Sequence, residues 1–231
     1  MVEENFGDLS VFDKIYATDY WGGGSGAGST IKATLRYKKF IERFLRDREI
    51  SSIVDLGCGD WQFSQFIDFA DATYKGFDVA ETVVKENQKS FASDTVSFEC
   101  LKNYEDLPPA DLLICKDVLQ HLSNDEVKKV LSILPRYKFA LITNDVVGMS
   151  RFGEFLWKSM HPFSAPLINR EIKIGDYRPL DPTEEPFGIK AKKVFQWQVN
   201  KFGVRTRFSM RNLVDGISCE SVKRTYLHEN A

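Results

Sequence analysis

The chain has 231 residues, which suits one α/β domain, and 43% of them are hydrophobic, so a sizeable core can be buried. The formal net charge of −2 lacks the basic excess that is typical of nucleic-acid-binding domains. No apolar run approaches the roughly 20 residues that a membrane span needs, and the acidic, polar start is unlike a secretory signal.

The distribution of cysteine and basic residues bears on location and partners. The four cysteines, Cys58, Cys100, Cys115 and Cys219, show no metal-ligand spacing, so we expect reduced thiols in a cytoplasmic protein. Basic residues gather in the last quarter of the chain, where solvated edges are the ordinary interpretation and partner binding is the alternative. They are Lys190, Lys192, Lys193, Lys201, Arg205, Arg207 and Arg211.

The first distinctive segment is WGGGSGAGST, residues 21–30. Its glycine and serine content is typical of a flexible linker. An amphipathic pattern from Tyr37 to Leu45 predicts a helix immediately after it, which Ser29 or Thr30 can cap. A glycine-rich loop that enters a helix offers free N–H groups to a carboxylate or phosphate, so both interpretations, linker and ligand loop, stay open.

Strand and helix patterns alternate from residue 51 to residue 145. Ser123 and Glu126 have the spacing of a capping box before the last of these helices. The alternation predicts βαβ units and a mostly parallel sheet with helices on both faces. We expect strands at 51–57, 73–79, 96–101, 111–117 and 138–145, and helices at 61–69, 81–91 and 124–134.

Residues 146–190 break this alternation, because prolines and glycines recur there. Such a segment is typical of a lid or a substrate-binding insertion. Two more strands are expected at 192–199 and 204–210, with a turn near Gly203 between them. They predict an antiparallel hairpin that finishes the sheet.

The sequence IVDLGCGDWQF marks the expected ligand site. Gly57 and Gly59 follow the first strand, at the edge where open α/β sheets bind ligands, and their missing side chains allow close approach. Asp78 ends the second strand, where an acid typically binds ribose hydroxyls. Gln62 replaces the third glycine of a dinucleotide fingerprint, and Asp55 suits a cationic group but repels a diphosphate. These residues favour a positively charged nucleoside and leave a NAD-dependent reductase as a minor alternative.

The motifs around this site resemble those of class I S-adenosylmethionine-dependent methyltransferases. VDLGCGD resembles their D-x-G-x-G motif, GFDV their ribose-binding acid, and DLLICKDVLQHLSNDE their fourth strand and the segment after it. More closely, the chain resembles a group of bacterial and viral methyltransferases, most of them uncharacterised, with YWG..SG.GS, DLGCGDWQFS, CKDVLQHL, TND and YRPLD segments. The resemblance implies a Rossmann-like class I methyltransferase fold, with a mostly parallel seven-stranded sheet flanked by helices and an antiparallel C-terminal hairpin.

The resemblance also implies S-adenosylmethionine as cofactor, with S-adenosylhomocysteine as product. Asn103 is a departure, because the third strand of the family often ends in an acid that contacts adenine. A single domain over 1–231 is expected, with an N-terminal loop and helix (1–49), a cofactor-binding core (50–145), a lid (146–190) and C-terminal strands (191–231). The residues implied to bind the cofactor are Trp21, Gly22, Ser29, Asp55, Gly57, Gly59, Asp60, Trp61, Asp78, Val79, Asn103, Lys116 and Asp117.

Methyl transfer to a hydroxyl needs a group that takes up the hydroxyl proton. His121 is the leading candidate, because histidine titrates near neutrality, and packing beneath the cofactor is the alternative. Asp117 lies four residues earlier and can orient the imidazole if the segment is helical, or it contacts cofactor or backbone. Asp145, at the end of the fifth strand, is a second candidate base, a ligand for substrate hydroxyls or a cap of the next element.

Tyr177 and Arg178, in the sequence GDYRPLD, are candidates for acceptor contacts. Arg178 can bind a carboxylate or sugar hydroxyls, or it can tie down the proline-rich loop. No metal ion is expected, because no tight ligand spacing supports one.

We therefore expect a methyltransferase that acts on a hydroxyl of a small molecule, sugar or glycan. One alternative is methylation of a protein or nucleic acid, which the basic C-terminal quarter supports. Nucleic acid is disfavoured, because TNDV differs from the N-P-P-Y-like tetrad usual for methylation of base amino groups. A non-catalytic module that binds the cofactor is the other alternative.

Overall fold

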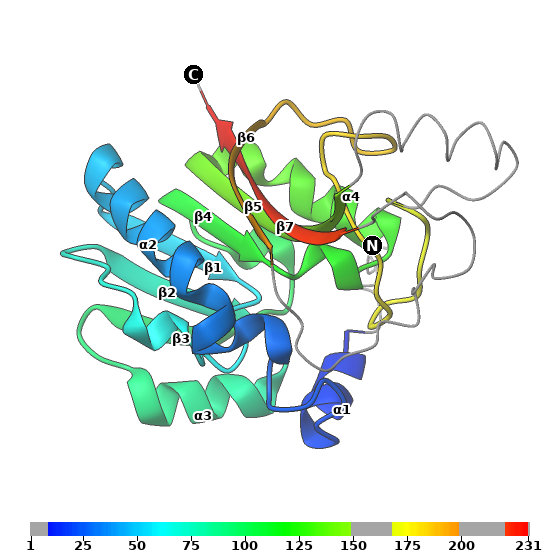
Figure 1. Ribbon diagram of the computed structural model, residues 1–231. Coiled ribbons are helices and arrows are strands. Elements are labelled where there is room, and N and C mark those ends of the chain that lie inside the picture. Colours follow the sequence, from blue (N-terminus) through cyan, green and yellow to red (C-terminus); the bar gives the residue numbers. More distant parts are fainter. Residues whose placement is uncertain (1–8, 149–167, 199–219, 231) are drawn as a thin grey trace, which may run out of the picture.

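The computed structural model describes residues 9–148, 168–198 and 220–230, and seven strands of these residues form one sheet (Figure 1). The strand order is β3-β2-β1-β4-β5-β7-β6. The first five strands pair in parallel, and β7 is antiparallel to both β5 and β6. The strands are β1 (Ser52–Leu56), β2 (Thr73–Asp78), β3 (Val96–Cys100), β4 (Ala110–Lys116), β5 (Tyr137–Gly148), β6 (Lys192–Gln198) and β7 (Glu220–Glu229). The predicted sheet is thereby confirmed.

Four α-helices accompany the sheet in the described residues: α1 (Val11–Ala17), α2 (Ile31–Arg48), α3 (Glu81–Phe91) and α4 (Asn124–Ser132). Thr30 is the N-cap of α2, because its hydroxyl accepts a hydrogen bond from the Ala33 N–H at 3.3 Å. Ser123 caps α4 through the Glu126 N–H in the same way. The carboxylate of Glu126 turns to Lys129 instead, so we find only the serine half of the predicted capping box in the hydrogen bonds.

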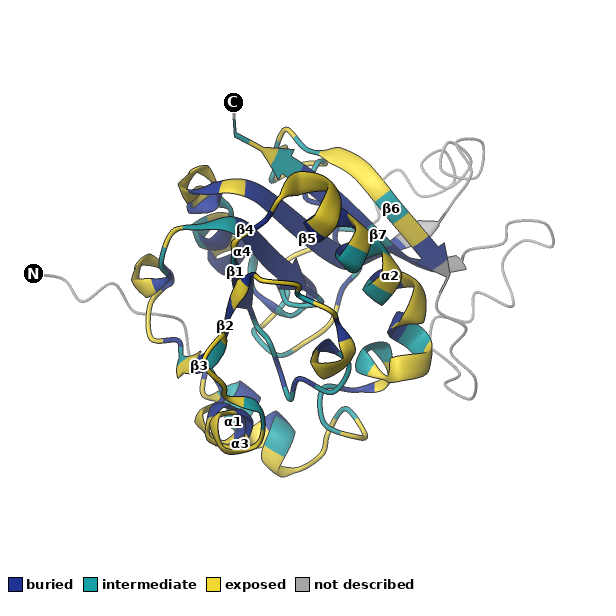
Figure 2. Cartoon of the chain, turned by 90° about the vertical axis from the view of Figure 1, so that its left-hand side faces the viewer, coloured by how far each residue is buried: buried dark blue, intermediate teal, exposed yellow. Residues whose placement is uncertain are grey.

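Two apolar clusters lie on opposite faces of the sheet. On one face, Tyr37 and Ile41 of α2 pack with strand residues such as Leu112. On the other face, Val127 of α4 packs with strand residues such as Leu113. Successive strand residues point to opposite faces, and both faces are covered, so the central strands are dark blue in Figure 2, whereas β6 at the edge carries exposed residues. In the part of the chain that the structure describes, no helix has the length and apolarity to cross a membrane.

One predicted helix is wrong. Residues 61–69 contain only a short 3₁₀ turn, Ser64–Phe66. Trp61 has a left-handed backbone (φ 54°), which an α-helix cannot accommodate. Its indole is buried against Tyr74 and Phe98, with ring centroids 5.5 and 5.2 Å away. Packing of this aromatic side chain therefore decides the local backbone.

The C-terminal hairpin uses a strand that the sequence pattern did not predict. The strand expected at 204–210 lies outside the described residues, and the antiparallel partner of β5 and β6 is β7. Charged Lys223 and Arg224 interrupt the apolar alternation of β7, which hides it from a pattern search. Of the predicted lid, residues 168–190 are described, and they run beside the ends of β4 and β5. Arg178 N–H donates to the Gln120 carbonyl and Leu180 N–H to the Asp145 carbonyl.

Candidate functional site

A cavity of about 320 Å³ opens at the carboxyl ends of the parallel strands. β1 and β4 are neighbours in the sheet, and the chain leaves them toward opposite sides, which is the position where open α/β sheets bind ligands. The loops after β1, β2 and β4 line the cavity together with residues 25–29 of the glycine-rich segment. The cavity lies at the edge of the sheet where the sequence predicts a ligand site.

Gly57 and Gly59 allow three loops to meet at this place. Both have positive φ angles, 72° and 58°, which side chains rarely tolerate. A Cβ on Gly57 would lie 2.2 Å from Val118 Cγ2, and one on Gly59 would lie 2.3 Å from Ser25 Oγ. The missing side chains make room for neighbouring protein atoms as well as for a ligand.

Asp78 presents a buried carboxylate to the cavity at the end of β2. Gly59 N–H donates to its Oδ2 at 2.9 Å and Ala80 N–H to its Oδ1 at 3.0 Å. Burial raises the pKa of Asp78 above the ordinary value, although these backbone donors oppose the shift. A carboxylate has about four acceptor sites, so this group can also accept hydroxyl donors from a ligand.

Asp55 lies on β1, and its carboxylate also lines the cavity. The Tyr74 hydroxyl donates to Asp55 Oδ2 at 2.6 Å. Burial raises the pKa of Asp55 to about 6, even though Tyr74 and the charge of Lys116 favour the ionised form. A cationic ligand group would shift the balance further toward the carboxylate.

The glycine-rich segment is tied to the loop after β1. Ser25 Oγ donates to Asp60 Oδ1 at 2.7 Å, and Ser25 N–H donates to Asp60 Oδ2 at 3.1 Å. Tyr16 OH lies 2.9 Å from Ser25 Oγ. Asp60 therefore holds the glycine-rich segment in place and does not itself line the cavity. Within the segment, Trp21 and Ser29 line the cavity and Gly22 does not.

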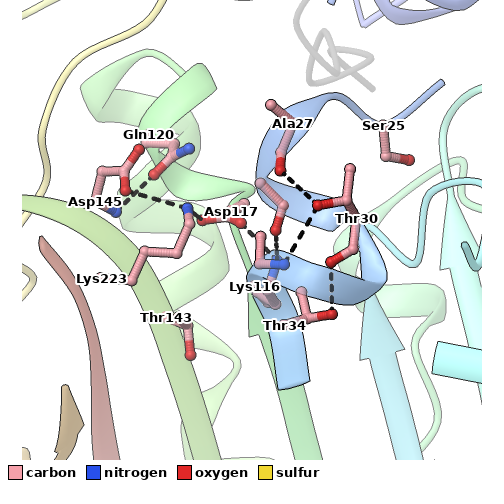
Figure 3. Close-up of polar contacts among 12 residues, drawn as sticks. Ser25, Ala27, Thr30, Thr34, Lys116, Asp117, Gln120, Thr143, Asp145 and Lys223 are labelled. Atoms are coloured by element: carbon pink, nitrogen blue, oxygen red, sulfur yellow. Dashed lines mark hydrogen bonds and ion pairs between the residues drawn. The ribbon is translucent and has the colours of Figure 1, made fainter. Parts of the chain in front are cut away.

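Four charged side chains alternate along one wall (Figure 3). Lys116 Nζ donates to Asp117 Oδ2 at 2.6 Å, and Lys223 Nζ donates to Asp117 Oδ1. Lys223 Nζ also lies 3.1 Å from Asp145 Oδ1. Burial opposes ionisation of Asp117, but the two lysines hold its pKa well below the usual range. The row is thus a network of paired charges in which Asp117 is a carboxylate.

His121 faces the cavity from a 3₁₀ turn, Leu119–His121. Its Nδ1 lies 2.9 Å from the carbonyl oxygen of Asp176. A carbonyl only accepts, so Nδ1 carries the hydrogen, and Nε2 of the neutral ring accepts a hydrogen bond from the Gln120 side-chain amide at 3.4 Å. Burial lowers the pKa of His121, which keeps the ring neutral at pH 7. The predicted orientation by Asp117 is replaced by this contact with Asp176.

Asp145 and the two predicted acceptor-binding residues have different surroundings. The Tyr177 hydroxyl donates to Asp145 Oδ2 at 3.1 Å, and both residues line the cavity. Arg178 is fully buried outside the cavity lining, and its guanidinium donates to the Leu122 carbonyl at 2.6 Å and to Asn124 Oδ1 at 3.1 Å. Arg178 therefore ties down its loop, and it does not line the cavity in which an acceptor would bind.

The predicted residues fall into two groups. Trp21, Ser29, Asp55, Gly57, Gly59, Asp78, Val79, Lys116, Asp117, His121, Asp145 and Tyr177 line the cavity. Gly22, Asp60, Trp61, Asn103 and Arg178 do not. Asn103 is exposed and bonds to Asp106. Sequence reasoning missed Tyr16, Ser25, Tyr74, Gln120 and Lys223. Ser25 lay within the glycine-rich motif and Gln120 within CKDVLQHL, whereas the other three gave no local signal.

No family model and no curated protein matches the sequence. Solved structures do match. Magnesium protoporphyrin IX methyltransferase from Synechocystis PCC 6803, with bound SAH, is 16% identical over 94% of this chain and 97% of that chain, with a TM-score of 0.52. The methyltransferase domain of bacterial CtHen1-C is 13% identical over 84% and 97%, with a TM-score of 0.51. Human N-acetylserotonin methyltransferase in complex with SAM is 12% identical over 96% of this chain and 59% of that chain, with a TM-score of 0.51.

Two further matches are a putative sarcosine dimethylglycine methyltransferase from Galdieria sulphuraria and PKMT2 from Rickettsia typhi. The present chain covers only 56% of the first and 24% of the second. At identities this low, the likeness establishes the fold alone. The chain has the Rossmann-like fold of these methyltransferases, and its own sheet is a mixed sheet of seven strands.

Proposed function

We propose that the chain binds S-adenosylmethionine and transfers its methyl group. The supporting observation is the pair of buried carboxylates, Asp55 and Asp78, that flank the glycine loop at the carboxyl ends of β1 and β2. Asp78 would accept the ribose hydroxyls, and Asp55 would face the cationic amino group. Two structural neighbours were crystallised with SAH or SAM, which agrees with this choice of cofactor.

A dinucleotide fits these residues less well. A diphosphate on the glycine loop would lie close to the Asp55 and Asp78 carboxylates, and like charges repel. In addition, the backbone N–H and the hydroxyl of Ser25 already donate to the Asp60 carboxylate, so they are not available to phosphate oxygens. Both points favour a cofactor without phosphate groups.

When bound, S-adenosylmethionine supplies a methyl group on an activated sulfonium, and the sulfur keeps the electron pair of the broken bond. The protein must then align the acceptor oxygen and remove its proton. His121 Nε2 is suited to take that proton, because Asp176 fixes the ring and burial keeps it neutral. We assign the role of general base to His121.

The acceptor in this proposal is a hydroxyl of a small molecule or sugar. Trp21, His121 and Tyr177 form an aromatic wall, with ring centroids 5.1 Å apart for Trp21 and His121 and 5.9 Å for His121 and Tyr177. Aromatic faces suit the apolar face of an acceptor ring. Asp145, beside Tyr177, can accept hydrogen bonds from the hydroxyls of that acceptor. A macromolecular acceptor is the second candidate, since exposed Lys190, Lys192 and Lys193 lie on or beside the edge strand β6.

Calorimetry with S-adenosylmethionine tests the proposal directly. Asp78→Asn removes the charge from an acceptor of ribose hydroxyls, and hydrogen bonds to charged groups contribute about 1.5–3 kcal/mol each, so we expect at least tenfold weaker binding. Asp94→Asn, at an exposed acid far from the cavity lining, is the matched control and should bind as the wild type does. Absent binding by the wild type, or equal affinity in both variants, would refute the assignment.

A further inference from the structure

Lys223 connects the cofactor side of the cavity with the acceptor side. It lies on β7 directly opposite Asp145 of β5 in the antiparallel register, which places the two Cβ atoms about 5 Å apart. Its ammonium contacts Asp145 Oδ1 at 3.1 Å and Asp117 Oδ1 (Figure 3). Only 3% of the Lys223 side chain and 5% of the Asp145 side chain are exposed. Water therefore does little to screen these three charges.

A buried cation between two carboxylates controls whether both can be ionised. Without it, two carboxylates in one buried site repel each other, and one of them takes up a proton. With it, burial opposes the charge of Lys223, but Asp117 and Asp145 raise the pKa of the ammonium above its ordinary value. Lys223 and Asp117 thus hold each other in the charged form.

We propose that Lys223 is a positioning residue of the transfer site, which fixes Asp117 and Asp145 as two ionised carboxylates on either side of its ammonium. The inference rests on the proposed methyl-transfer function. It also decides between two candidate bases. Asp145 is ion-paired with the ammonium and accepts from the Tyr177 hydroxyl, and a proton on its carboxylate would remove the charge on which the ion pair depends. It therefore serves as a fixed acceptor of hydrogen bonds, and the proton goes to His121 Nε2.

Among the residues that the structure describes, other titratable groups face this row from several neighbouring elements. They are Lys116 at the end of β4, His121 in the turn after it, Tyr177 in the segment before β6, and Tyr37 of α2. Tyr37 and Tyr177 stay neutral, because burial raises the pKa of each phenol above its ordinary value. Lys116 also pairs with Asp117, through the carboxylate oxygen that Lys223 does not contact. Loss of Lys223 therefore leaves Asp117 with one ammonium partner but removes the ammonium that Asp145 contacts.

Carbon-13 NMR of the aspartate side-chain carboxyls tests the inference on the full chain. In the wild type, the carboxyl signal of Asp117 should not titrate between pH 4.5 and 8, because the two lysines hold its pKa well below the usual range. In Lys223→Met, one carboxyl should take up a proton within this range, a change of at least tenfold in proton affinity. Lys223→Arg keeps the cation and should restore the flat profile. Thr225→Val, which breaks the buried hydroxyl contact with Thr143 on the same strands, is the structural control and should also be flat.

Titration of Asp117 in the wild type overturns the inference, and so does a flat profile in Lys223→Met or an Arg variant that titrates like the Met variant. If the Met variant does not fold, the wild-type and Arg profiles still decide the question. Calorimetry with S-adenosylmethionine on the same wild-type sample separates the two proposals. Ionised carboxylates without cofactor binding would refute the function and leave the charge arrangement standing.

Discussion

The hydrogen bond from Tyr74 to Asp55 predicts how cofactor binding depends on pH. The Asp55 pKa of about 6 is raised by burial, so the wild-type carboxylate is mostly ionised at pH 7 and mostly protonated at pH 5. If the ionised form faces a cationic cofactor group, affinity should fall as the pH drops through about 6. Tyr74→Phe removes the donor 2.6 Å from Asp55 Oδ2 and leaves the ring in place.

The size of the effect follows from this one contact. A hydrogen bond to a charged group contributes about 1.5–3 kcal/mol, and about 1.4 kcal/mol corresponds to one pKa unit. The pKa of Asp55 should therefore rise from about 6 to about 7–8 in Tyr74→Phe. At pH 7 the ionised fraction then falls from about nine-tenths to between about one half and one-tenth, which weakens binding roughly two- to tenfold.

Calorimetric titrations with S-adenosylmethionine between pH 5 and pH 9 measure both profiles. The variant should regain wild-type affinity at pH 9, where Asp55 is ionised in both proteins. Proton release on binding, measured in buffers of different ionisation enthalpy, should be larger for Tyr74→Phe at pH 7. Affinity that does not change with pH in the wild type, or a variant whose loss persists at pH 9, would refute the reasoning about Asp55.

Two further predictions separate catalytic from structural roles. His121→Gln should lower turnover by about 10²- to 10⁴-fold while the cofactor Kd stays within about threefold. Because burial lowers the pKa of His121, wild-type turnover should rise with pH through a value below 6.5 and then stay flat; an acid limb that persists in the variant would exclude this base. Arg178→Lys loses the planar pair of contacts with Leu122 and Asn124, so thermal unfolding should show a loss of about 1–3 kcal/mol. Cofactor affinity should stay unchanged; a weaker Kd at unchanged stability would contradict the structural role.

The part of the cavity that we propose binds the cofactor could be located from the sequence because its signals are local. Gly57 and Gly59 follow an apolar run directly, and Asp78 ends the next one, so the carboxyl ends of two parallel strands bring them together. Thr30 was likewise a predicted cap, and the structure confirms it. Each of these predictions needed only short-range patterns and the rule that parallel strands end at one edge.

The acceptor side could not be predicted in this way, because it is assembled by distant segments. Lys223 reaches the cavity only through the pairing of β7 with β5, and its charge obscured the strand that carries it. Trp61 stood within a motif yet turns into the core, since its backbone is left-handed and its ring packs on aromatic neighbours. Arginine is usually an exposed residue that can bind a ligand, but the fold buries Arg178. Tertiary packing decides all three.

The balance of charges in the cavity narrows the chemistry of the acceptor. Among the described residues that line it, four aspartates (Asp55, Asp78, Asp117 and Asp145) face two lysines (Lys116 and Lys223). Both lysines already contact Asp117, so neither ammonium is free of a carboxylate to meet a phosphate. A phosphorylated acceptor would have to enter beside Asp145 and displace an ammonium from its carboxylate partner. The free-energy cost of breaking such an ion pair grows as water is excluded. A neutral acceptor meets no such cost, because its hydroxyls can donate to Asp145 while Trp21 and Tyr177 cover its apolar face.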